Sequence, residues 1–332
     1  MEIRDLLARN VLLVVDPYTL GKSADEFMAD FGGYMGQIAA VAKDESGFAL
    51  YNSKHAPLHE TYGDFFSTIA EAAGAAGITL YAVINVFIDD YYAVDPSYKT
   101  YNSDGVAADG FVCPNREAFW SYLANIADEL SDFPIKGIIL QGLSYVRENY
   151  CFCNTCKNEF AKVAGLDFVA GFESLRDDPE VLSKWFKWRA EKISAAVSKI
   201  HETVKGKGID VLSTVNLDPG TGYQDGAYRH FGQEIESLSG ITNHVLINLN
   251  AWSPILPKVD TPEFNALNQR LLFLRNITAR RRRISFMYWS FTDEDEFESI
   301  RKIASFFNAT KLITYPKFPR NYKRWRELHL NI

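Results

Sequence analysis

The chain lacks the features that would tie it to a membrane or to nucleic acid. No apolar run reaches the ~20 residues that a membrane-spanning helix needs, and the first ten residues, MEIRDLLARN, are too charged for a signal peptide. Acidic residues outnumber basic ones, which gives a formal net charge of -7. An acidic protein is a poor partner for DNA, RNA or an anionic membrane. We therefore expect a soluble, cytoplasmic protein that binds none of these.

A glycine-rich phosphate loop is also missing. An open, doubly wound sheet that binds a nucleotide carries such a loop after an early strand, and none follows the first strand-like runs here. The chain nevertheless has 332 residues, of which 47% are hydrophobic, so it can build a large core. A single α/β barrel domain reaches this length.

Apolar runs alternate with helical segments along the whole chain. Gly77 is placed to end one helix, while Asp178-Pro179 and Thr261-Pro262 are typical helix starts. The expected strands are Val11–Val15, Ile38–Ala42, Thr79–Phe87, Gly137–Leu140, Val211–Asn216, Val245–Asn250, Ile284–Trp289 and Lys311–Tyr315. Eight strands that alternate with helices predict one (β/α)8 TIM barrel over residues 1–332.

The carboxyl ends of the strands form the ligand-binding end of such a barrel. Carboxylates, amides and aromatic rings follow the predicted strands, and this mixture suits a carbohydrate, whose faces stack on rings while its hydroxyls need polar partners. A barrel end that meets water is also polar without a ligand. We predict that the substrate-binding residues are Asp16, Asn85, Gln141, Arg147, Asn248, Trp252, Trp289 and Tyr315.

Hydrolysis of a glycosidic bond ordinarily needs two carboxyl groups. Asp218 lies just beyond the fifth predicted strand, and Asp44 and Glu45 follow the second, so these three are the candidate catalytic residues. Asp16 and Glu148 are further carboxylates that could form part of a pair. Asp218 precedes Pro-Gly, where the alternative is an Asx turn. The alternative for Asp44 and Glu45 is an ion pair with Lys43 that shapes their loop.

Cysteine is scarce, and its four copies are clustered. Three of them form a C-x-C-x2-C pattern after strand 4, and the fourth precedes them. Four thiolates fill the tetrahedral shell of zinc and leave no position open for water. We therefore predict one structural zinc per chain, joining the extended loops 88–116 and 144–165, with disulfides as the alternative. The predicted ligands are Cys113, Cys151, Cys153 and Cys156.

Two histidines, His55 and His59, flank a proline-containing turn. Their spacing suggests a second metal site, but no third ligand lies nearby in the sequence. We expect them to be surface residues.

Residues 10–165 resemble a known family. The stretch Lys43-Asp44-Glu45-Ser46-Gly47, the segment Val112-Cys113-Pro114-Asn115 and the cysteine run Cys151–Cys156 resemble the hypothetical glycosyl hydrolase family 6. Those barrels are similar to the family 42 β-galactosidases, which carry a structural zinc on a comparable cysteine pattern. The resemblance implies a glycosidase-like barrel that acts on or binds a carbohydrate.

One position departs from the pattern that the resemblance implies. Strand 4 of such relatives usually ends in a carboxylate, whereas Gln141 stands here, and no Asp or Glu lies between Lys136 and Arg147. Glutamine can bind a sugar hydroxyl, but it cannot transfer a proton or act as a nucleophile. Two hypotheses follow. One is a glycoside hydrolase with displaced carboxylates; the other is an inactive barrel that binds a sugar or a protein, and either can form a homo-oligomer.

Overall fold

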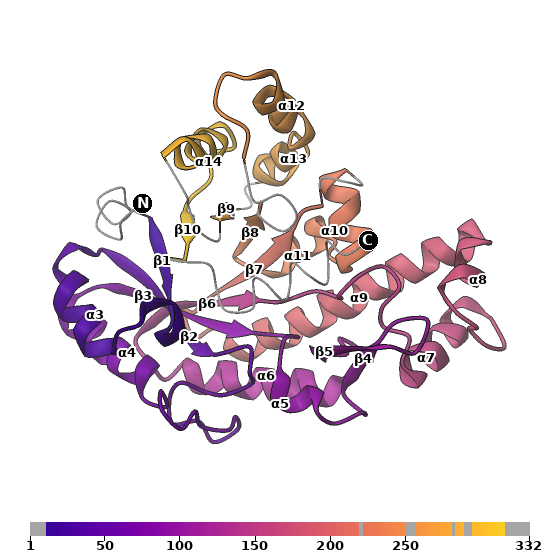
Figure 1. Cartoon of the computed structure of the whole chain (residues 1–332), viewed down its shortest axis with the longest axis horizontal. Helices are drawn as coiled ribbons and strands as arrows, with labels where there is room; N and C mark the ends of the chain where they lie inside the picture. Colours follow the sequence, from indigo (N-terminus) through magenta and orange to yellow (C-terminus); the bar gives the residue numbers. More distant parts are fainter. Residues whose placement is uncertain (1–10, 219–221, 250–255, 281–282, 289–293, 316–332) are drawn as a thin grey trace.

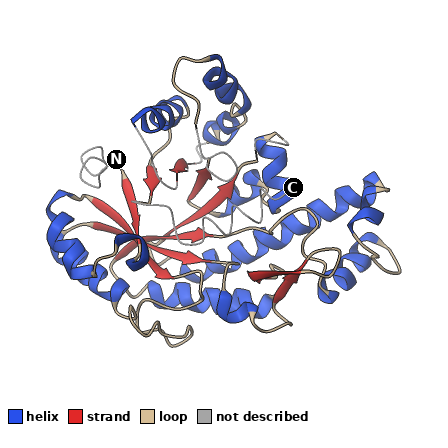
Figure 2. Ribbon diagram, viewed as in Figure 1, coloured by secondary structure: helices blue, strands red, loops and turns tan. Residues whose placement is uncertain are grey.

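The computed structural model describes residues 11–218, 222–249, 256–280, 283–288 and 294–315. In this part of the chain, parallel strands close into a barrel in the order β1-β10-β9-β8-β7-β6-β3-β2, with helices around it (Figures 1 and 2). The barrel strands are β1 (Leu12–Val15), β2 (Gln37–Lys43), β3 (Thr79–Asn85), β6 (Ile135–Gln141), β7 (Asp210–Asn216), β8 (His244–Asn248), β9 (Arg283–Tyr288) and β10 (Leu312–Thr314).

The predicted (β/α)8 TIM barrel is confirmed, because each predicted run coincides with one barrel strand. The strands are apolar without alternation since helices cover one face and the barrel interior covers the other. Every residue of β1, for example, is buried. The predicted single domain over residues 1–332 reaches beyond the described ranges and stays a prediction.

The helices begin and end as local sequence signals indicate. Gly77 ends α4 (Phe65–Ala76) in the left-handed conformation, at a φ of 67° that glycine adopts without strain. The Asp178 carboxylate caps α9 (Pro179–Val204). The other helices are α2 (Pro17–Leu20), α3 (Ala24–Phe31), α5 (Asp90–Ala93), α6 (Glu117–Leu130), α7 (Asn154–Ala164), α8 (Phe172–Arg176), α10 (Tyr223–Phe231), α11 (Ile235–Ile241), α12 (Pro262–Arg270), α13 (Leu274–Ala279) and α14 (Glu294–Phe306), with a 3-10 turn, η1 (Gly32–Tyr34).

Among the residues that the structure describes, no helix has both the length and the apolar character needed to cross a bilayer.

The extended loop 88–116 contains regular structure that the sequence analysis did not predict. Within it, β4 (Lys99–Tyr101) and β5 (Ala107–Val112) form an antiparallel pair. Figure 1 shows this pair beside α7, away from the barrel strands. The amide of Phe152 donates to the Tyr101 carbonyl at 2.8 Å, so the hairpin is bonded to the loop that carries the cysteines.

Candidate functional site

Polar side chains from several strands meet in the mouth of the barrel. The Tyr315 hydroxyl donates to Oε1 of Gln141, although β10 and β6 lie on opposite sides of the closed barrel. A bond between strands that are not neighbours crosses the interior, so both side chains point into the mouth. Asn85 is the register partner of Gln141 on β3 and faces the same side.

Two amides line the neighbouring part of the mouth. Nδ2 of Asn248, on β8, donates to Oδ1 of Asn216, on β7, at 3.1 Å.

On β3, Oδ1 of Asn85 is buried and has no hydrogen-bond donor among the described residues. A buried acceptor without a donor costs free energy unless water or a ligand supplies the bond. The mouth therefore contains an acceptor suited to a ligand hydroxyl.

Asp16 lies directly after β1 and caps α2. Its carboxylate accepts hydrogen bonds from the Thr19 amide at 2.8 Å and from the Thr19 hydroxyl at 3.0 Å. Burial raises the pKa of Asp16, and the nearby charge of Asp44 adds to this effect. Burial also raises the pKa of Tyr315, with further contributions from the charges of Asp16 and Glu45. Tyr315, Asp16 and Glu45 follow β10, β1 and β2, which are consecutive in the barrel, so the three residues share one side of the mouth.

Asp44 is held in one orientation by two donors. Its Oδ1 accepts from the Phe48 amide at 2.9 Å, and its Oδ2 accepts from the Tyr18 hydroxyl at 3.0 Å. The alternative of an ion pair between Lys43 and Asp44 is wrong, because Lys43 Nζ lies 2.8 Å from Oδ2 of Asp89, with both side chains fully buried. Successive residues of an extended chain point to opposite sides, so Lys43 faces away from its neighbour.

Asp218 lies on the opposite side of the barrel, beyond β7. Its Oδ2 is 3.2 Å from Nε2 of His230, near the end of α10. Burial lowers the pKa of His230, against the charges of Asp218 and Glu148. Burial likewise lowers the pKa of Arg147, against the charges of Tyr150, Glu148 and Asp218. Arg147 thus belongs to a second polar group around Asp218.

The structure brings most of the predicted residues to the mouth but separates the candidate carboxylates. Asp16, Asp44 and Glu45 lie after β1 and β2, whereas Asp218 follows β7 across the barrel. The predicted residues Trp252 and Trp289 lie outside the described residues. His230 was not predicted, because it lies twelve residues after Asp218 with no local motif to connect them.

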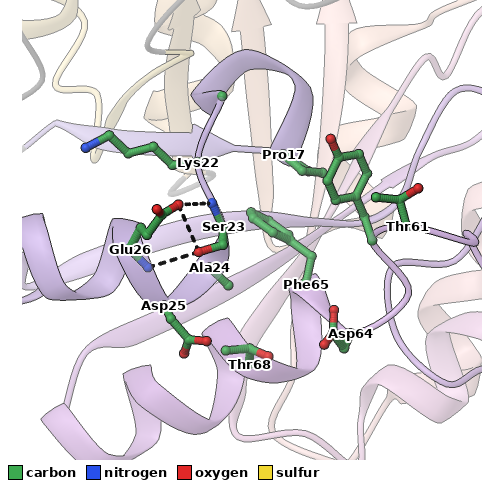
Figure 3. A pocket seen from close by; sticks show the side chains of 12 residues that line it. Pro17, Lys22, Ser23, Ala24, Asp25, Glu26, Thr61, Asp64, Phe65 and Thr68 are labelled. Carbon is green, nitrogen blue, oxygen red and sulfur yellow. Dashed lines mark hydrogen bonds between the residues drawn. The ribbon is translucent and has the colours of Figure 1, made fainter.

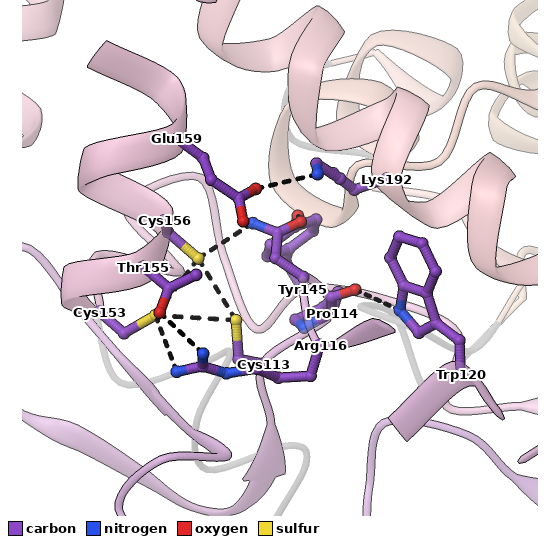
Figure 4. Close-up of polar contacts among 11 residues, drawn as sticks. Cys113, Pro114, Arg116, Trp120, Tyr145, Cys153, Thr155, Cys156, Glu159 and Lys192 are labelled. Atoms are coloured by element: carbon purple, nitrogen blue, oxygen red, sulfur yellow. Dashed lines mark hydrogen bonds and ion pairs between the residues drawn. The ribbon is translucent and has the colours of Figure 1, made fainter. Parts of the chain in front are cut away.

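The four cysteines form a compact cluster between the two extended loops. Their sulfur atoms all lie within 4.8 Å of one another. Cys113 Sγ is 3.8 Å from that of Cys153 and 3.3 Å from that of Cys156 (Figure 4). Zinc with Zn–S bonds of ~2.3 Å holds its sulfurs about 3.8 Å apart in a tetrahedron. All four thiols are free, so the structure favours the metal site over disulfides.

Donors around the cluster also suit a metal held by thiolates. Nδ2 of Asn115 donates to Cys156 Sγ at 3.0 Å, and the Tyr101 amide donates to Cys151 Sγ at 3.5 Å. Cys153 is the N-cap of α7, where the helix dipole favours negative charge. Such outer contacts orient metal ligands and stabilise their charge.

No protein-family model and no curated protein matches the chain. Solved structures do match it. The α-L-fucosidase isoenzyme 2 from Paenibacillus thiaminolyticus aligns over 96% of this chain and 48% of its own, with a TM-score of 0.64 and 16% identity. The catalytic domain of β-amylase from Paenibacillus polymyxa aligns over 93% of both chains, with a TM-score of 0.63 and 12% identity.

A third match is the β-galactosidase from the psychrophilic Marinomonas ef1, which aligns over 93% of this chain and 54% of its own, with a TM-score of 0.62 and 9% identity. The chain thus spans about half the length of the fucosidase and galactosidase chains. At these identities the likeness concerns the fold alone. The resemblance to the hypothetical glycosyl hydrolase family 6 stays a prediction. The chain has a barrel fold that these three glycoside hydrolases also have.

Proposed function

We propose that this protein binds a carbohydrate in the mouth of the barrel and hydrolyses a glycosidic bond there. Asp16 acts as the proton donor and Glu45 as the second carboxylate. The observation that carries this assignment is their placement, since Asp16 directly follows β1 and Glu45 lies just after β2, the strand that pairs with β1 in the barrel. Burial raises the pKa of Asp16, and a general acid has to keep its proton near the working pH.

The amides of the mouth bind the sugar. Oε1 of Gln141 is occupied by the Tyr315 hydroxyl, which leaves the Nε2 hydrogens of Gln141 for a sugar hydroxyl. Oδ1 of Asn85 accepts from another hydroxyl. Gln141 therefore orients the substrate at the position where the resemblance implies a catalytic carboxylate.

A second candidate function is carbohydrate binding without hydrolysis. Two observations favour it. Gln141 cannot transfer a proton, and the Asp16 carboxylate already accepts two hydrogen bonds as a helix cap.

If the protein is a hydrolase, Asp218 beside His230 is the alternative catalytic carboxylate. Asp44 serves chiefly to hold Tyr18 and Phe48.

The cysteine cluster holds one zinc ion per chain in this proposal. Four thiolate ligands leave no open position, so the zinc joins the loops and takes no part in the reaction. The ligand set and the sulfur spacing support this assignment.

The test is a panel of chromogenic glycosides of both anomers with wild type, Asp16→Asn, Glu45→Gln and Asp218→Asn. Asp132→Asn, at an exposed position in the turn between α6 and β6, is the matched control. We expect Asp16→Asn to reduce kcat by about 10²–10⁴-fold, the usual contribution of a general acid. If Asp218→Asn loses activity while Asp16→Asn and Glu45→Gln keep it, the catalytic carboxylate is Asp218, on the opposite side of the barrel. A wild type that binds sugars in calorimetry but cleaves none would establish the binding function instead.

A further inference from the structure

Five partly exposed aromatic rings border the mouth on the side of β1 and β2. We call Tyr18, Phe48, His59, Tyr62 and Tyr91 the aromatic strip. Ring centroids are 5.4 Å apart for Tyr18 and Tyr62, 5.8 Å for Phe48 and His59, and 6.2 Å for Phe48 and Tyr91. None of the five is buried, and Tyr91 is 53% exposed. Contiguous apolar surface of this kind commonly marks a binding site.

The aromatic strip begins at the proposed catalytic site. The Tyr18 hydroxyl and the Phe48 amide both donate to the Asp44 carboxylate, which precedes Glu45. Asp44 thereby fixes two members of the strip relative to the mouth. A ligand that extends out of the mouth past Glu45 reaches these rings first.

His59 supplies a polar group within the strip. Its Nδ1 accepts from the amides of Thr61 and Tyr62, both at 3.1 Å, which places the proton of the neutral ring on Nε2. Within the described part of the chain, no residue accepts a hydrogen bond from Nε2 of His59. The strip therefore combines ring surfaces with an available N–H donor.

A pocket of about 410 Å³ continues the surface beyond Tyr62 (Figure 3). The Ser23 and Glu26 side chains on its wall bond to each other's amides in a capping box, at 3.2 and 2.8 Å. Other polar groups that line it are Lys22, Asp25, Thr61, Asp64 and Thr68. Aromatic rings next to a polar, open pocket fit a polyhydroxylated chain better than an apolar partner.

We infer that the aromatic strip is a second carbohydrate subsite, so that the substrate is an oligosaccharide with one unit in the mouth and the next on these rings. The inference rests on the proposed function, since it takes the mouth as the first subsite. Sugar faces stack on the rings, and His59 Nε2 donates to a hydroxyl. The aromatic strip gives the protein a preference for oligosaccharides over monosaccharides.

The experiment compares binding of a monosaccharide, a disaccharide and a trisaccharide from cello-, malto- and galacto-oligosaccharide series, by calorimetry. Tyr91→Ala removes the most exposed ring of the strip, so the fold tolerates the change. Tyr34→Ala is the matched control, because Tyr34 is a 63% exposed tyrosine in the turn that precedes β2, at the other end of the barrel. Asn85→Ala tests the mouth itself.

In wild type we expect affinity to rise by roughly threefold to tenfold when a stacked unit is added. Tyr91→Ala should lose that gain while Tyr34→Ala keeps it, and Asn85→Ala should weaken every sugar alike. An unchanged gain in Tyr91→Ala overturns the second subsite and leaves the mouth standing. A wild type that binds no sugar of any length overturns both proposals, and self-association weakened by Tyr91→Ala would then assign the strip to a protein contact.

Discussion

Asp16 combines a structural role with the chemistry that we propose for it. As the cap of α2 it accepts the Thr19 amide, a role that either Asp or Asn fills equally well. Asp16 is also a buried acid, and its ionisation destabilises the folded state because desolvation disfavours the charged form. Function and stability therefore conflict at this residue.

We expect Asp16→Asn to keep the cap and to raise the free energy of unfolding at pH 7. The folded-state pKa of Asp16 lies above its unfolded value, so the ionised group destabilises wild type at neutral pH. As the pH falls through the raised pKa, the native state takes up the proton and this cost disappears. Urea denaturation at pH 7 and about pH 4 checks the prediction, with the exposed variant Asp132→Asn as the control. A variant less stable than wild type at pH 7 would contradict it.

At the scale of elements, buried groups hold the loops above the barrel in place. The cysteine cluster joins the β4–β5 hairpin to the start of α7. Arg189, fully buried on α9, donates to the carbonyls of Arg147, Arg229 and His230 at 2.5, 2.6 and 3.0 Å. Its guanidinium lies 4.2 Å from the ring centre of Tyr145. Loop geometry near Asp218 thus depends on a helix on the outside of the barrel.

Purified protein should contain about one zinc per chain by elemental analysis. Cys153→Ser should release it and lower Tm by roughly 5–10 °C, because zinc binding contributes directly to the stability of the joined loops. Asn154→Ser, an exposed change next to the ligand, is the control. Wild type that is metal-free and keeps its Tm in a chelator would refute the zinc assignment.

Arg189→Lys should lower the free energy of unfolding by roughly 2–4 kcal/mol. A single ammonium cannot reach three carbonyls with the geometry of a guanidinium, so buried acceptors lose their donors. Lys187→Arg, a change of the same kind on the exposed face of α9, should leave stability unchanged. Equal denaturation midpoints for the two variants would show that the loops are held by other contacts.

At the scale of the whole molecule, the two ends of the barrel differ in chemistry. The carboxyl ends of the strands hold the amides and carboxylates of the mouth. The amino ends hold a cluster around His244, whose Nδ1 lies 3.3 Å from the Thr310 hydroxyl. Burial lowers the pKa of His244 to about 4, with Asp210 opposing the shift and Arg283, Lys311 and Lys136 adding to it.

The contribution of His244 to the free energy of unfolding should therefore fall in mild acid. Because the folded-state pKa of His244 is depressed, the unfolded chain binds the proton first as the pH falls from about 6.5 towards 4, and up to about 3 kcal/mol is lost. His244→Gln should flatten the free energy of unfolding between these pH values, whereas His55→Gln, at an exposed position, should not. A pH dependence identical in wild type and His244→Gln would assign acid lability to other groups.

Local sequence patterns determined much of this protein. Apolar runs without alternation marked the barrel strands, since a strand covered on both faces has no polar side. Gly77 and Asp178 marked helix ends through backbone conformation and capping, which depend on a few neighbouring residues. The close spacing of Cys151, Cys153 and Cys156 likewise predicts a site for one metal ion, because three ligands come from a single short segment.

Only the tertiary structure decided which distant residues meet. It placed Lys43 against Asp89, His230 against Asp218, and Tyr315 across the barrel from Gln141. Barrel closure sets these pairs, because strand order and pleat decide which side chains share the interior, and no local pattern encodes that closure. The aromatic strip arose in the same way, from rings scattered between Tyr18 and Tyr91 that the loops after β1, β2 and β3 bring to one surface.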